Sequence, residues 1–136
     1  MKKLLLLLIF ITSCYKEPVP EPFSFYYLTN SCLSVDFHDD TIILIGDESE
    51  YKQYCLCENS EKIDFSKYYL LGYKTTGQCT LNNIKDIYDD KELKRYIYNI
   101  TVVDTGLCKS MVIDMNWVVI TRFPENTYSI QVNINK

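Results

Sequence analysis

Hydrophobic and polar side chains alternate with a period of two along most of the chain after Phe25, which is the pattern of half-buried β-strands. The clearest example runs from Tyr128 to Ile134, where apolar residues occupy every second position between Ser, Gln and Asn. Two further segments, 96–103 and 111–120, also have strand character, and Pro124-Glu125-Asn126 supplies a turn before the last strand. We therefore expect these three segments to form a three-stranded C-terminal meander.

The earlier part of the chain predicts shorter elements. Thr41 to Ile45 is a β-branched run closed by a glycine, which is typical of a buried strand. Asp47 to Tyr54 begins with acidic residues and spaces two tyrosines three apart, so it predicts one or two turns of helix. Residues 67–73 return to strand character, and Lys74 to Gly77 has the composition of a turn.

Residues 81–88 fit either a helix or a strand by spacing, but Asp89 to Glu92 resembles a hairpin turn and favours a strand. Tyr numbers 12 and hydrophobic residues make up 47% of the 136 residues, which suits a β-rich core. The predicted fold is all-β: one small antiparallel β-sandwich or open barrel with one short helix, over residues 25–136.

The N-terminus carries a secretory signal. Lys2 and Lys3 precede an apolar run from Leu4 to Ile11, which is shorter than the roughly 20 apolar residues that a bilayer-spanning helix needs. The stretch from Phe10 to Cys14 resembles a bacterial lipobox. That resemblance implies removal of a signal peptide, residues 1–13, and lipidation of the Cys14 sulfur; the alternative is a buried first helix with an incidental cysteine.

Residues 14–24 predict a tether between the lipid anchor and the domain. Three prolines alternate with other residues in this segment and keep it extended. Glu17 and Glu21 resemble the acidic surface-export signals of Bacteroidota-type lipoproteins. We expect a membrane-anchored protein of the cell envelope, at the outer membrane, on its periplasmic or its surface face.

Five cysteines remain after Cys14, and outside the cytoplasm they favour up to two disulfides and one leftover thiol. Cys79 and Cys108 form the best-placed pair, since each follows a nearby glycine and lies beside a strand-like segment. Cys32 would then pair with Cys55 or with Cys57. A zinc site around Cys55-Leu56-Cys57 is the alternative, but the chain has no second paired knuckle.

The candidate chemistry is sparse. His38 is the single histidine and lies among Asp36, Asp39 and Asp40, a set that could bind a divalent metal. A solvated turn is the preferred interpretation, because adjacent strand residues point to opposite faces. No G-x-S-x-G elbow is present. We predict no catalytic residue, no metal site and no cofactor.

Other polar and aromatic positions have structural interpretations. Asp114 lies between Ile113 and Met115 on a predicted strand, so it should face outward if Ile113, Met115 and Trp117 face in. A net charge of -4 without a basic stripe argues against nucleic acid as a partner. Seven tyrosines could contact a protein or a sugar, but packing within the sheets is the preferred interpretation: Tyr26, Tyr27, Tyr68, Tyr69, Tyr73, Tyr96 and Tyr98.

Short phrases over residues 41–136 resemble the PrcB-like protease-complex-subunit domain and small Bacteroidota envelope lipoproteins. The phrases are Thr41–Ile45, Glu48–Tyr51, Ile63–Tyr68 with its Asp-Phe-Ser-Lys, Gly77-Gln78-Cys79, Gly106-Leu107-Cys108 and Asn116–Val119. The resemblance implies a small β-sandwich or open barrel that contacts other envelope proteins. Gln78 and Cys79 stand where the protease-complex pattern has a second glycine and an aromatic residue, so a protease partner is not carried over.

These observations favour a lipid-anchored, non-catalytic interaction module of the cell envelope, whose partner is an envelope protein or a glycan. One alternative is a metal-assisted hydrolase using His38 and the nearby aspartates. The other is a structural envelope protein without a specific ligand.

Overall fold

The structure is a computed structural model that describes residues 25–28, 33, 36, 38, 40–57, 60–124 and 126–136. The predicted signal peptide, Cys14 and the tether lie outside these residues. No helix within the described ranges is long and apolar enough to cross a membrane.

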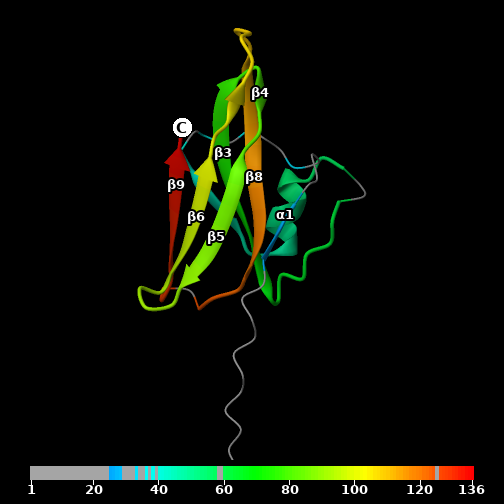
Figure 1. Ribbon diagram of the computed structural model, residues 1–136. Coiled ribbons are helices and arrows are strands. Elements are labelled where there is room, and N and C mark those ends of the chain that lie inside the picture. The colour runs from blue at the N-terminus through cyan, green and yellow to red at the C-terminus, as the bar shows by residue number, and fades with distance from the viewer. Residues whose placement is uncertain are drawn as a thin grey trace, which may run out of the picture.

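Two β-sheets and one helix form three layers (Figure 1). The larger sheet is antiparallel and has the strand order β1 (Phe25–Tyr27), β8 (Met111–Thr121), β3 (Tyr68–Gln78) and β2 (Ile42–Ile45). The smaller sheet has the order β5 (Ile84–Asp90), β6 (Arg95–Thr101) and β9 (Ser129–Asn135). A two-stranded ribbon, β4 (Thr80–Leu81) with β7 (Asp104–Thr105), lies where the chain passes between the sheets, and α1 spans Glu48–Tyr54. The prediction of a small all-β fold with one short helix is confirmed.

The β3–β8 pair forms the centre of the larger sheet. Its antiparallel register runs over eleven residue pairs, from Tyr68 opposite Thr121 to Gln78 opposite Met111. Both faces of this pair are covered, and Leu70, Leu71 and Val118 are completely buried although neighbouring residues point to opposite faces. The pair therefore contributes apolar surface to two separate cores.

One core lies between the two sheets and is largely aromatic. Tyr69 and Tyr73 of β3 meet Tyr96 and Tyr98 of β6 there, and Phe123 packs against Tyr69 with ring centroids 4.9 Å apart. The second core lies between the larger sheet and α1. The presence of two cores explains why the central strands carry large apolar side chains on both faces.

The helix-side core depends on a close approach at Gly72. The ring of Trp117 lies over this glycine, and a Cβ at position 72 would come within 2.2 Å of a ring carbon. Tyr51 is the buried residue of α1 and donates a hydrogen bond from its hydroxyl to the Glu61 carbonyl at 3.0 Å. The helix begins as predicted, because the Asp47 carboxylate accepts the Glu50 backbone N–H at 2.8 Å.

The predicted C-terminal meander is wrong. β6 and β9 belong to the smaller sheet and run parallel, with Arg95 opposite Ser129 and Thr101 opposite Asn135. β8 belongs to the larger sheet and lies between β1 and β3. Alternation identified each strand correctly, but it does not show which strands are neighbours. β8 lies in the larger sheet, where its two faces pack against two different cores.

The predicted turn from Lys74 to Gly77 is also wrong, since these residues continue β3 up to Gln78. Thr75 there is buried and its neighbours pair with β8, so pairing with a long partner outweighs the polar composition of the segment. The preference for a strand over residues 81–88 is confirmed by β5, and a turn over residues 91–94 joins β5 to β6.

The buried tyrosines predict a loss of stability in alkali. Burial raises the pKa of Tyr51 to about 12, and burial also raises the pKa of Tyr96 and Tyr98 above the ordinary value of 10. The folded state disfavours the ionised phenols, so this stability is fully present below pH 10 and is lost as the pH rises toward the folded pKa. The part of the tyrosinate absorbance that belongs to the buried phenols should appear together with the loss of far-ultraviolet circular dichroism, in one cooperative step above pH 10. Complete titration near pH 10 with the fold intact would contradict this packing.

Candidate interaction surface

Two of the three connections between the two sheets run side by side at one end of the sandwich, which we call the crossover end (residues 77–81 and 104–111). The chain leaves β3 through β4 to reach β5, and it leaves β6 through β7 to reach β8. β4 and β7 pair with each other through Thr80 opposite Thr105 and Leu81 opposite Asp104. In Figure 1 this end is the extension at the top of the view.

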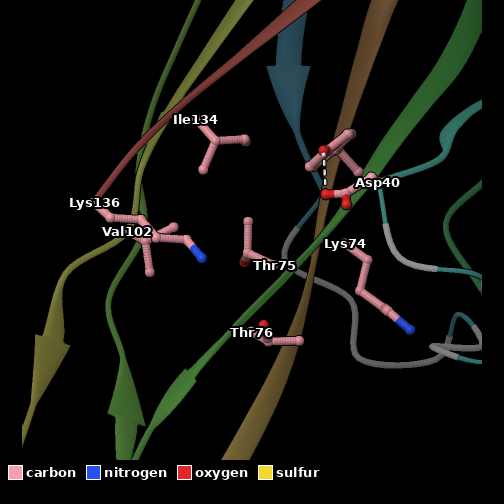
Figure 2. Close-up of a pocket in the computed structure, with 8 residues that line it drawn as sticks. Asp40, Lys74, Thr75, Thr76, Val102, Ile134 and Lys136 are labelled. Atoms are coloured by element: carbon pink, nitrogen blue, oxygen red, sulfur yellow. Dashed lines mark hydrogen bonds between the residues drawn. The ribbon is translucent and has the colours of Figure 1, made fainter.

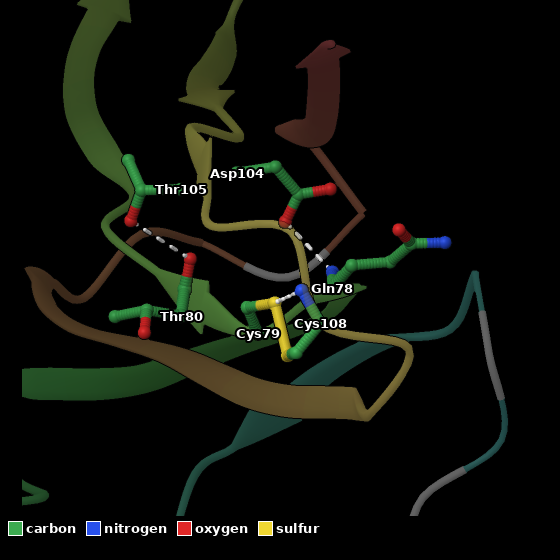
Figure 3. Close-up of a disulfide and its surroundings, with 6 residues drawn as sticks. All are labelled: Gln78, Cys79, Thr80, Asp104, Thr105 and Cys108. Atoms are coloured by element: carbon green, nitrogen blue, oxygen red, sulfur yellow. Dashed lines mark hydrogen bonds between the residues drawn. A yellow bond between two sulfur atoms is a disulfide. The ribbon is translucent and has the colours of Figure 1, made fainter.

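A disulfide between Cys79 and Cys108 joins the two connections, as the sequence predicts (Figure 3). Their Cα atoms are 5.3 Å apart, and 29 residues separate them along the chain. Cys79 has a positive φ of 63° and donates its backbone N–H to the Ser110 carbonyl at 2.9 Å. The bridge therefore fixes the exit of β3 against the entry of β8.

Two glycines make room for this arrangement. Gly106 has a φ of 118°, and a Cβ there would lie 2.8 Å from the Cys79 Cβ. At Gly77 a Cβ would lie 2.2 Å from the Asp104 carboxylate, which accepts the Gln78 backbone N–H at 2.8 Å. The sequence showed the glycines beside the cysteines but gave no sign of the Asp104 contact, because that residue is distant from Gln78 along the chain.

Apolar side chains are exposed at the crossover end and on the adjoining start of β8. Leu107 is fully exposed at 104%, Met111 is 75% exposed and Ile113 is 44% exposed. Met111 and Ile113 share a face of β8 with the buried Met115, but they lie beyond the part of that face that the helix-side core covers. We call Leu107, Met111 and Ile113 the distal patch. The prediction that Ile113, Met115 and Trp117 all face in is correct for Met115 and Trp117 but wrong for Ile113, which stays 44% exposed.

A polar network lies beneath the crossover end, between the two sheets. The Asn83 side-chain amide donates to Thr75 Oγ1 at 2.9 Å, to Asp114 Oδ2 at 2.7 Å and to Asn116 Oδ1 at 3.0 Å as alternative acceptors. Asn116 is completely buried and donates to the Tyr73 carbonyl at 3.1 Å. The network connects the start of β5 with β3 and β8, so it holds the crossover end in a fixed position on the sandwich.

The outward orientation predicted for Asp114 is wrong. Its side chain is half-buried and lies on the face of β8 that looks toward the smaller sheet, where it meets Asn83. The sequence could not place Asn83 or Asn116 in a network, because an isolated amide residue within an apolar segment carries no periodic signal.

A cavity of about 480 Å³ lies between the end of β9 and the second half of β3 (Figure 2). Hydroxyl groups of Thr75 and Thr76 line it together with Lys136 and the apolar Ile134. On its other side the Tyr73 hydroxyl donates to Asp40 Oδ1 at 3.1 Å, and burial with this neighbouring carboxylate raises the Tyr73 pKa. The lining is mixed and polar, and it offers hydrogen-bonding groups rather than an activated nucleophile.

The structure brings few of the other predicted site residues together. Asp36 and His38 are exposed, and Asp39 lies outside the described residues. Across the described ranges, no group of three or more His, Cys, Asp or Glu side chains is placed to hold a metal ion. Cys57 is in a disulfide with a cysteine outside the described residues. Cys32 also lies outside the described residues. Cys55 is half-buried and is not in a disulfide. The pairing of Cys32 stays a prediction.

The tyrosines mostly serve packing, as preferred from the sequence. Tyr69, Tyr73, Tyr96 and Tyr98 are buried between the sheets. The remaining members of the predicted set are half-buried beside the two cores, namely Tyr26, Tyr27 and Tyr68. The exposed chemistry of the crossover end is therefore aliphatic rather than aromatic.

Removal of the disulfide tests how the distal patch is held. In the Cys79→Ser/Cys108→Ser variant we expect a loss of about 2–4 kcal/mol in the free energy of unfolding, since the open chain gains freedom in the unfolded state. Urea unfolding measures this loss, and hydrogen exchange should show faster exchange over residues 104–110. Cys55→Ser is the matched control, because it removes a thiol that is not in a disulfide. An unchanged urea midpoint and unchanged exchange in the double variant would show that the Cys79–Cys108 disulfide does not hold the crossover end in place.

Comparison of the chain with protein-family models, with curated proteins and with solved structures gave no match.

Proposed function

We propose that this chain is a lipid-anchored cell-envelope protein that acts as a non-catalytic interaction module, and that the distal patch contacts another envelope protein. The observation that carries the proposal is the exposure of Leu107, Met111 and Ile113 on an end that a disulfide holds in place. Exposed apolar side chains near one end of a domain are candidates for sites of protein contact. Burial of a Leu or Met side chain by a partner would contribute about 1.5–3 kcal/mol.

The direction of the patch supports this role. β1 begins at Phe25, which is opposite Ile120 near the end of β8, whereas the patch lies around Met111 at the start of β8. Eleven residues of β-strand span about 35 Å. A chain anchored through Cys14 and a short tether would therefore present the patch on the side away from the lipid.

The chemistry of the patch supports a protein partner over a glycan. Sugars are bound mostly by exposed aromatic faces combined with hydrogen-bonding groups, whereas the patch is aliphatic. The Cys79–Cys108 disulfide also fits an oxidising compartment outside the cytoplasm, in agreement with the lipobox-like sequence at Cys14.

One experiment tests the anchor and the contact together. The full-length chain, with a photo-crosslinking amino acid in place of Leu107, is expressed in its native host with radiolabelled palmitate. Lys91 is the control position, since it is exposed on the β5–β6 turn, far from the crossover end in Figure 1. We expect a labelled membrane protein and a discrete crosslinked product from position 107 that is absent from position 91.

Two further variants decide the interpretation. Cys14→Ser should lose both the palmitate label and membrane retention, and a label that persists would contradict the anchor. Met111→Asp, which adds a charge to the patch, should abolish the product formed from position 107. A product that is equally strong from both positions, or that Met111→Asp leaves unchanged, would contradict the contact and favour a structural protein without a specific ligand.

A further inference from the structure

The outer edge of β9 has no partner strand within the ranges that the structure describes. Among the described residues β9 pairs only with β6, on its inner side. The Ser129 N–H donates to the Lys94 carbonyl at 3.0 Å, and the Asn135 carbonyl accepts the Val102 N–H at 2.8 Å. Odd-numbered residues therefore direct their backbone groups toward β6, and the alternation of a strand turns those of Ile130, Val132 and Ile134 outward.

The two edges of the smaller sheet differ in charge. β5 carries Lys85, Asp86, Asp89 and Asp90 within seven residues, and such charged side chains discourage pairing at a sheet edge. β9 carries no ionisable side chain and no proline over its seven residues. The edge of β9 therefore lacks the features that keep an exposed strand from accepting another one.

The sequence of β9 is nearly the same in both directions. It reads Ser-Ile-Gln-Val-Asn-Ile-Asn, with Val132 at its centre. A second copy laid antiparallel on it about Val132 would place Ile130 opposite Ile134, Gln131 opposite Asn133 and Ser129 opposite Asn135. Every residue would face one of similar size and polarity, and no like charges would meet.

We propose that β9 is a self-association edge at which a second copy of this chain adds antiparallel about Val132. The two smaller sheets then form one continuous six-stranded sheet. All six outward backbone groups of Ile130, Val132 and Ile134 are satisfied in this register, since alternate opposed pairs exchange two hydrogen bonds each. The side chains of these three residues, which already pack against the core between the sheets, continue that core into the second copy.

The proposal is independent of the distal patch, because the patch belongs to the larger sheet and to the crossover end. A chain associated in this way would display two copies of the patch. Failure of the contact at Leu107 would leave the β9 edge unaffected, and the reverse also holds.

Register-specific crosslinking in membranes tests the proposal. Two full-length variants with different tags, Gln131→Cys and Asn133→Cys, are expressed together. In the proposed register these positions form a pair without backbone hydrogen bonds, with Cα atoms about 4.5 Å apart, which a disulfide can bridge. The matched control combines Gln131→Cys with Ser129→Cys, which the register separates by four residues along the strand. We expect about tenfold more mixed dimer from the first combination than from the control, because only the first meets the distance limit of a disulfide.

A proline at the centre provides a second measurement. Val132→Pro removes an outward N–H without removing a bond to β6, so the fold should persist while the mixed dimer is lost. Circular dichroism checks the fold, and the crosslinking result stands without this variant. Equal dimer from both cysteine combinations, no dimer at all, or capture of a different envelope protein by the cysteine at position 131 would each overturn self-pairing.

Discussion

The pairing of β3 with β8 over eleven residues is the interaction on which the rest of the structure depends. It supplies one wall of the aromatic core between the sheets and one wall of the core beneath α1. Since both faces of the pair are buried, each connection to the smaller sheet must leave at an end of these strands. Both connections at the crossover end do so together, which is why one disulfide can join them.

Structural features that depend on only a few neighbouring residues were predicted well from the sequence. The short helix with acidic residues at its start, the alternation along β9 and the pairing of Cys79 with Cys108 each have a local cause, and each appears as expected. The end of β3 and the neighbours of β8 could not be predicted, because they depend on a partner strand far away in sequence. Period two also assumes one wet face, and this assumption fails for β8, where Asp114 and Trp117 lie on opposite covered faces.

In the candidate site, too, features with a local cause were predictable and features that depend on distant contacts were not. The Cys79–Cys108 disulfide could be predicted from the positions of the cysteines and the expected oxidising compartment. The exposure of Met111 and Ile113 could not be predicted, because it depends on where the helix-side core ends. The polar network under the crossover end was not predicted, because Asn83 and Asn116 come within hydrogen-bonding distance only when the two sheets pack face to face. In the functions that we propose, the sandwich supports two contact surfaces, the distal patch and the outer edge of β9.

Native-state hydrogen exchange measures whether the β3–β8 pair is the most stable part of the fold. If the β3–β8 pair is the base of the fold, the amides in its middle, such as those of Leu71 and Val118, exchange only through global unfolding and are the slowest in the chain. The amides of β5 and β9 exchange faster, through partial opening of the smaller sheet. Slowest exchange in the smaller sheet, with β3 and β8 opening first, would contradict the account.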